Sequence, residues 1–215
     1  MSINRIYNEI KNNETSIITK NDLREYSRKF HYRLRNVIQY LSSQNAILKL
    51  FADLYYIKDE ETNNLTEPIS SFYKLIGDAL EYKGIENWYF GLYTALELGG
   101  YKEVSEENDK DIYIICKRQP VRENVIECQG FNLKFIRLRE NFFTFGIIKD
   151  GISYSDYERT LLDFVMLWKR NRKHTMRIIG DLNKLMAKAS VDKIKQYLTN
   201  YPIEIKKVME EYFSR

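Results

Sequence analysis

The order of apolar and polar positions along residues 1–58 changes from helical spacing to strand alternation and back. Apolar residues three and four apart indicate helices, and short β-branched or alternating runs indicate strands. Thr19-Lys-Asn-Asp22 has the form of a capping box, which places a helix start there. The predicted elements are a helix over 2–12, a strand over 15–19, helices over 20–30 and 31–44, and a hairpin with strands at 47–51 and 54–57.

This order of elements predicts that residues 1–58 form a winged helix-turn-helix domain. In the helix over 31–44, Leu34, Val37 and Leu41 fall on one side of a wheel that turns about 100° per residue, and the other side is polar. The second helix of such a motif enters the major groove, where Arg pairs with guanine and Asn or Gln pairs with adenine. The candidate base-reading residues are Tyr32, Arg35, Asn36 and Gln39.

The preceding helix and turn, together with the hairpin, carry cations suited to phosphate contact. Lys and Arg side chains that neutralise phosphates give an affinity that falls steeply with salt. The hairpin tip, residues 51–53, has no arginine and includes Asp53, so we expect it to contribute little to binding. A polar helix face is also typical of a solvated surface or of a protein-docking module. The candidate phosphate-contacting residues are Arg24, Arg28, Lys29, Arg33 and Lys49.

Residues 58–67 are acidic and polar without periodic apolar positions, which indicates a domain boundary. Beyond them the spacing predicts helices, then strands separated by turn signals, then helices again. The predicted fold class is therefore α+β, in which the winged helix-turn-helix is followed by a domain over 59–215 with an antiparallel sheet and C-terminal helices. The predicted helices cover 68–84, 88–100, 158–171, 175–188, 190–199 and 202–213, and the predicted strands cover 112–117, 124–130, 132–139 and 142–155.

The segment YERTLLD, residues 157–163, indicates a helix start with a structural role. Ser155-Asp-Tyr-Glu158 has the form of a capping box, and the two leucines would face a core. Arg159 and Asp163 stand four residues apart on the predicted helix. We expect them to form an ion pair between residues i and i+4, which contributes only ~0.2 to 0.5 kcal/mol.

Charge is distributed unevenly along the chain, although the net charge of the whole sequence is only +4. Residues 1–58 hold ten basic and five acidic side chains, residues 59–168 hold twelve and twenty, and residues 169–215 hold twelve and five. Basic ends indicate contact with a polyanion. A second basic strip fits either another row of phosphates or the acidic surface of a partner protein, and consists of Lys169, Arg170, Arg172, Lys173 and Arg177.

No motif in the sequence indicates a catalytic residue or a metal site. The glycine-rich phosphate loops, the GxSxG motif and the HExxH motif are missing, and the two histidines are far apart. Cys116 and Cys128 have neither CxxC spacing nor nearby histidines, so we expect packing thiols. The prediction is a protein that is not an enzyme and needs no cofactor. No apolar run reaches the ~20 residues of a membrane helix and no signal peptide is indicated, which favours a cytoplasmic protein without membrane contact.

Several segments together carry a resemblance to a known family. LYYI, NWYFGLYTALELGGY, the strands around IYIICKRQPVRENVIECQGFNLKFIRL, and ISYSDYERTLLDFV follow one another as in AbiEi-type antitoxins. The resemblance implies an N-terminal winged helix that represses its own operon and a C-terminal domain that counters a nucleotidyltransferase toxin encoded next door. The family often has Arg and Gly in the wing, where this chain has Ala52-Asp53. The most specific match is YERTLLD, at Glu158, Arg159, Leu161, Leu162 and Asp163.

We therefore expect a transcriptional autorepressor that acts as the antitoxin of a toxin–antitoxin pair. Its expected partners are double-stranded DNA, in the operator of its own operon, and a nucleotidyltransferase-like toxin. Two alternatives stay open, a stand-alone winged-helix transcription factor and a nucleic-acid-processing enzyme that uses the winged helix for docking. The identity of the adjacent gene separates the first alternative from the antitoxin, because an antitoxin requires a toxin.

Overall fold

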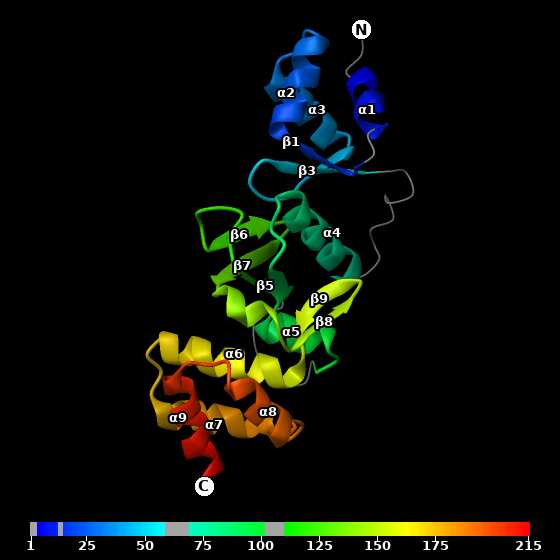
Figure 1. The fold of residues 1–215 in the computed structure, drawn as a ribbon. Coiled ribbons are helices and arrows are strands. Elements are labelled where there is room, and N and C mark those ends of the chain that lie inside the picture. The colour runs from blue at the N-terminus through cyan, green and yellow to red at the C-terminus, as the bar shows by residue number, and fades with distance from the viewer. Residues whose placement is uncertain (1–3, 13–14, 59–68, 102–109) are drawn as a thin grey trace. The chain divides into compact units, whose positions relative to one another are not determined.

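The computed structural model describes residues 4–12, 15–58, 69–101 and 110–215, and over these ranges the chain is a mixed α/β protein with nine α-helices and two sheets (Figure 1). The chain divides into two compact units. Unit 1 comprises Met1–Glu86 and Pro120–Phe131, and unit 2 comprises Asn87–Gln119 and Asn132–Arg215. The predicted domain boundary falls in residues 59–67, which lie outside the described ranges. None of the helices in those ranges is long and apolar enough to cross a membrane.

Unit 1 begins with the elements that the sequence pattern predicts. The strands pair antiparallel in the order β1-β3-β2, and β2 with β3 forms the predicted hairpin. The capping box is confirmed, since Thr19 Oγ1 accepts a hydrogen bond from Asp22 N and Asp22 Oδ2 accepts one from Thr19 N. The elements are α1 (Asn4–Lys11), β1 (Ile17–Thr19), α2 (Lys20–Lys29), α3 (Leu34–Ser43), β2 (Ile47–Lys49), β3 (Leu54–Ile57), α4 (Ile69–Tyr82) and β6 (Val125–Cys128).

The helix predicted over 31–44 begins three residues later than expected. His31 adopts a positive φ of 59°, which no α-helical residue has, and Arg33 is extended as the N-cap of α3. The amide of Tyr32 donates to the carbonyl of Ser27 at 2.8 Å, so the connection folds back on the end of α2. A sharp α2–α3 turn is the result, and it lets the two helices pack against each other.

The core of unit 1 lies where the three N-terminal helices meet one face of the small sheet. Ile6 and Ile10 of α1, Leu23 of α2, and Val37 and Leu41 of α3 are all buried in it. Each of these helices contributes apolar residues three or four apart, as an amphipathic helix must in order to bury one stripe. The rotation of α3 about its own axis is therefore fixed by the side chains on its inner face.

Unit 2 combines a sheet with α5 and a group of four C-terminal helices (Figure 1). Its strands occur in the order β7-β5-β4-β9-β8, and α6 contacts α5, α7, α8 and α9. The elements are β4 (Trp88–Phe90), α5 (Leu92–Leu98), β5 (Asp111–Cys116), β7 (Phe131–Arg137), the 3-10 helix η3 (Glu140–Phe143), β8 (Ile147–Asp150), β9 (Ile152–Ser155), α6 (Tyr157–Arg170), α7 (Thr175–Met186), α8 (Val191–Leu198) and α9 (Ile203–Phe213).

The prediction of a helix over 88–100 is wrong in its first part. Trp88–Phe90 is the strand β4, which pairs antiparallel with β5 and parallel with β9, and its three aromatic side chains are buried. A short, fully apolar run is compatible with either a buried strand or a buried helix. Here it forms a strand, because β5 and β9 pair with it on both sides. Gly91 then separates β4 from α5, and a Cβ there would meet the Ile115 side chain at 2.4 Å.

The prediction of an antiparallel sheet is also wrong, because the sheet is mixed. β5 pairs parallel with β7 along its whole length, from Asp111↔Asn132 to Cys116↔Arg137, and β4 pairs parallel with β9. Among the strands described for unit 2, the β4–β5 and β8–β9 pairs are antiparallel. Alternation along a strand indicates which side chains face the core, but it does not specify the neighbouring strand or its direction. The predicted strand over 142–155 is divided into part of η3 and the β8–β9 hairpin.

The start of α6 uses a different cap from the predicted one. Asp156 is the N-cap and accepts a hydrogen bond from the amide of Arg159 at 2.9 Å, whereas the Ser155 hydroxyl is 2.7 Å from that of Thr160. Glu158 accepts a hydrogen bond from the amide of Ser190 at 2.9 Å and pairs with Lys193. These carboxylates therefore tie the start of α6 to α8 and the residue before it.

Candidate nucleic-acid interface

The outer face of α3 is polar and exposed, and its inner face is anchored in the core. Arg35, Asn36 and Gln39 are exposed, while Val37 and Leu41 are buried. The three polar side chains come from one helix whose rotation is fixed, so they lie on one continuous surface. Tyr32 departs from the prediction, because it is half-buried, precedes the helix and packs against the core of unit 1.

The N-terminus of α3 differs from that of α2 in how its amide groups are satisfied. Arg33 occupies the N-cap without a side-chain hydrogen bond, and no acidic residue stands in the first turn. α2 instead has the complete capping box of Thr19 and Asp22. An uncapped helix N-terminus presents N–H donors and the positive end of the helix dipole, which is an arrangement that favours a phosphate.

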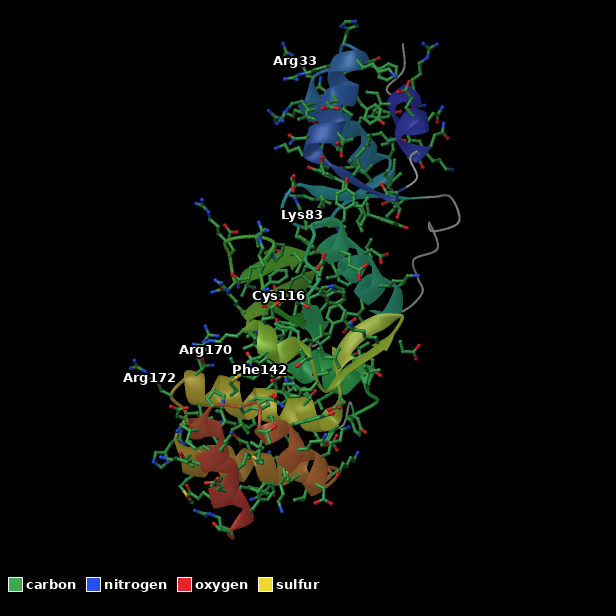
Figure 2. All side chains as sticks on the ribbon, in the orientation of Figure 1. Arg33, Lys83, Cys116, Phe142, Arg170 and Arg172 are labelled. Atoms are coloured by element: carbon green, nitrogen blue, oxygen red, sulfur yellow. The ribbon has the colours of Figure 1, made fainter. Side chains whose placement is uncertain are left out.

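The predicted phosphate-contacting residues divide into free and engaged cations. Arg28 and Arg33 are exposed, and neither side chain has a partner within the described ranges; Arg33 points away from the ribbon (Figure 2). Arg24 is exposed and donates to Asn21 Oδ1 at 2.5 Å. Lys29 fits less well than expected, because its Nζ forms an ion pair with Glu9 at 2.7 Å. The arginines are therefore the better candidates for phosphate contact.

The tip of the β2–β3 hairpin is packed into unit 1. Phe51 is only 1% exposed, and the carbonyl of Asp53 accepts a hydrogen bond from the amide of Lys20 at 2.7 Å. The Asp53 carboxylate pairs with Lys83, whose hydrogen bond lowers the pKa of that carboxyl (Figure 2 shows Lys83). Lys49 is exposed, and its carbonyl accepts from Gln129 Nε2 at 3.1 Å. The hairpin is thus held on both sides of its turn.

In the second basic strip, the lysines contact neighbouring side chains and the arginines do not. Lys169 lies 3.5 Å from Thr175 Oγ1, and Lys173 pairs with Asp181 and lies over the Trp168 ring at 4.6 Å. The three arginines are exposed, and none has a side-chain partner within the described residues: Arg170, Arg172 and Arg177. Arg170 and Arg172 project outward from the C-terminal end of α6 (Figure 2). Three exposed arginines without side-chain partners in the described residues thus lie at the end of α6, in the turn that follows it and in the first turn of α7.

The predicted ion pair of Arg159 and Asp163 is present, but both side chains are buried in unit 2, where the small contribution expected for such a pair does not apply. Arg159 is 0% exposed, and its Nε donates to Asp163 Oδ2 at 3.1 Å. Tyr89 OH donates to the same oxygen at 2.8 Å, and Tyr201 OH donates to Asp163 Oδ1 at 2.7 Å. The guanidinium also lies 4.2 Å from the centre of the Phe145 ring.

Burial and the charge of Asp163 shift the pKa values of this buried group. Burial raises the pKa of Tyr89 and of Tyr201 well above its usual range, and the Asp163 carboxylate raises both further. Burial is the largest effect on the pKa of Arg159 and lowers it, but the charge of Asp163, the two tyrosines and the hydrogen bond to Asp163 together raise it by more, so the net pKa is raised. The spacing of Arg159 and Asp163 could not reveal this, since the two tyrosines that complete the group come from distant segments. The group joins β4, α6 and Tyr201, which lies two residues before the start of α9.

Comparisons with known proteins give a fold but no family. No family model and no curated protein matches the sequence. Among solved structures, the chain is similar to the crystal structure of the RV2827C protein from Mycobacterium tuberculosis, with 13% sequence identity and a TM-score of 0.54. The similarity covers 98% of this chain and 75% of that one. At this identity it bears on the fold alone.

Proposed function

We propose that unit 1 contains a winged helix-turn-helix that binds double-stranded DNA through the outer face of α3. The observation that carries the proposal is the exposure of Arg35, Asn36 and Gln39 on a helix whose opposite face is buried. α2 and α3 are the two helices of the motif, and the β2–β3 hairpin is its wing.

The chemistry of the three outward residues suits direct reading of base pairs. Arg donates two hydrogen bonds to guanine O6 and N7, and Asn or Gln donates to and accepts from adenine. Each such pair contributes about 1–3 kcal/mol of discrimination against a wrong base. Arg35 and Gln39 are four residues apart and therefore follow the groove along one helix face.

Phosphate contacts come from the arginines of α2 and of the N-terminus of α3. Arg24, Arg28 and Arg33 are exposed, and Arg33 stands beside the uncapped amide groups of α3. Such contacts fix the orientation of the protein on the duplex and release counterions. The wing contributes little, because its tip is packed against unit 1 rather than extended.

We further propose that the chain represses its own operon and acts as the antitoxin of a nucleotidyltransferase-like toxin. The support is the resemblance to AbiEi-type antitoxins, whose most specific segment is YERTLLD. Co-expression with the product of the adjacent gene tests this part. Relief of growth arrest is expected, and persistent arrest at equal expression of both proteins would contradict it.

The DNA proposal is tested with a duplex from upstream of the gene and a scrambled duplex, both followed by fluorescence anisotropy. Arg35→Ala/Gln39→Ala should weaken binding to the upstream duplex by at least ~30-fold and abolish its preference over the scrambled one. Lys195→Ala/Gln196→Ala removes one exposed cation and one exposed amide from α8 and serves as the matched control. Equal affinity of the two double variants would end the direct-reading proposal.

A further inference from the structure

A small apolar cavity opens in unit 2 beside the C-terminal half of α6. Its volume is about 110 Å³. Leu92 and Ile115, which are both 1% exposed, lie among its buried lining residues. The cavity meets solvent through partly buried apolar side chains that also line it, namely Ile136, Leu138, Met166 and Leu167.

The sheet and α6 together determine the shape of this cavity. Ile115 of β5 and Ile136 of β7 are direct neighbours in the parallel pairing of these strands, one residue before the paired ends. Met166, Leu167 and Arg170 come from the last turns of α6. Two rigid elements therefore border the cavity, and rigid elements hold a binding pocket in place better than loops do.

The rim of the cavity is positively charged. Arg170 lines it, is exposed and has no side-chain partner within the described residues. Residues 164–180 contain five Lys or Arg residues and no Asp or Glu. Asp163 also lines the cavity, but its two carboxylate oxygens are already engaged by Arg159, Tyr89 and Tyr201. An incoming carboxylate would therefore meet a net positive field.

We propose that this cavity and Arg170 bind a short acidic segment of a partner protein. One aliphatic side chain of the partner fills the cavity, and a neighbouring carboxylate pairs with the Arg170 guanidinium. A cavity of about 150 Å³ accommodates the six carbons of benzene, so a cavity of about 110 Å³ takes roughly four, the number in a Leu or Ile side chain. The proposal concerns unit 2 and does not depend on DNA binding by unit 1.

The same features distinguish a protein partner from a nucleic acid. A phosphate backbone would use Arg170 but has no group to fill an apolar cavity. A nucleobase is read through hydrogen bonds, and among the lining side chains only Arg170 and the already engaged Asp163 carry polar groups that could form them. Protein interfaces are enriched in Arg and Met and depleted in Lys, and at this corner the arginines are free while Lys173 is paired internally. An apolar anchor in a pocket beside an arginine is typical of an interface hot spot.

The proposal is tested on the full chain with two synthetic peptides, acetyl-Glu-Glu-Leu-Glu-Glu-amide and its Ala counterpart. The methyl resonance of Met166, assigned by Met166→Leu, reports on occupation of the cavity. The leucine peptide should shift it saturably, and the alanine peptide should bind about 10-fold more weakly because it buries less apolar surface. Arg170→Gln should weaken the leucine peptide by about 5-fold and reduce its salt dependence.

Arg177→Gln is the matched control, since Arg177 is also exposed but does not line the cavity. It removes the same charge without changing the rim of the cavity, so it should weaken binding of the leucine peptide much less than Arg170→Gln does. Equal affinity of the two peptides, or no shift of Met166 at millimolar peptide, would overturn the proposal. So would an Arg170-dependent shift produced by a random-sequence oligonucleotide but not by either peptide, because the corner would then be a phosphate site.

Discussion

Removing the Asp163 carboxylate should destabilise unit 2 far more than an ion pair four residues apart on a helix surface would suggest. Asp163 accepts hydrogen bonds from Arg159, Tyr89 and Tyr201, and all four side chains are buried. Asp163→Ala leaves the Arg159 charge inside the protein without its partner. Breaking a buried ion pair in this way costs about 3–5 kcal/mol, compared with less than about 1 kcal/mol for an exposed pair.

Urea unfolding followed by tryptophan fluorescence measures this effect in the correct unit. Both tryptophans of the chain, Trp88 in β4 and Trp168 in α6, belong to unit 2. With a slope of about 2 kcal/mol per molar urea, the midpoint should fall by roughly 1.5–2.5 M. Arg215→Ala breaks a pair with the same spacing in which both side chains are about half exposed, and should change stability by less than about 0.5 kcal/mol.

The double variant Arg159→Met/Asp163→Leu distinguishes the contribution of the unpaired charge to the loss of stability from the contribution of lost packing. It removes both ions and fills much of the same space, so it should recover most of the stability that Asp163→Ala loses. The two tyrosine hydroxyls still lose their acceptor, which keeps the recovery incomplete. A loss below about 1 kcal/mol for Asp163→Ala, or a double variant less stable than the single one, would refute the argument that an uncompensated buried charge dominates.

Three further outcomes are expected. Arg33→Ala should weaken binding to all duplexes alike and lower the slope of log affinity against log salt by about 1, as measured by anisotropy from low to moderate salt. Gly146→Ala should lower the free energy of unfolding by about 1–3 kcal/mol, because Gly146 has φ +62° and an added Cβ would lie 2.8 Å from Cβ of Arg159. Gly151 has a similar φ of +67° but no atom within 4 Å of an added Cβ, so Gly151→Ala should lower it less in the same urea experiment. The pKa of Asp53 is lowered in the folded protein, so its contribution to stability is present above the unfolded pKa and is lost as pH falls through the lower folded value. Lys83→Met should therefore reduce the loss of stability at acidic pH. Urea midpoints measured between pH 2 and pH 6 by far-ultraviolet circular dichroism check this.

The elements that the sequence predicted best are those whose signals are local. The capping box at Thr19, the inward stripe of α3 and the stop of α4 at Gly84 each depend on residues within one or two helical turns. Gly84 has φ +68°, and the amide of Ile85 donates to the carbonyl of Leu80 as the helix ends. Such features follow from backbone conformation and capping, so a single sequence is enough to predict them.

The errors concern features that depend on distant partners. β4 is a strand because β5 and β9 flank it. The Arg159–Asp163 pair is buried together with the hydroxyl groups of Tyr89 in β4 and of Tyr201, two residues before α9. Neither partner can be identified from spacing along the chain. The exposed face of α3 could be predicted, whereas the engagement of Lys29 by Glu9 needed the placement of α1 against α2. Periodicity predicts which side of an element faces inward and leaves open what it meets there.

The division of the chain into units has a practical consequence for dissecting the protein. The polypeptide passes from unit 1 to unit 2 after Glu86, returns at Pro120 and leaves again after Phe131. No single truncation point therefore yields either unit whole. A fragment that ends at residue 58 would lack α4 with Lys83, which pairs with the hairpin, and Phe131, whose ring stacks on Phe72 at 5.0 Å. A fragment of this kind that failed to bind DNA would not test the proposed α3 surface, because the contacts that support the hairpin would be missing as well. Point substitutions in the intact chain test that proposal directly.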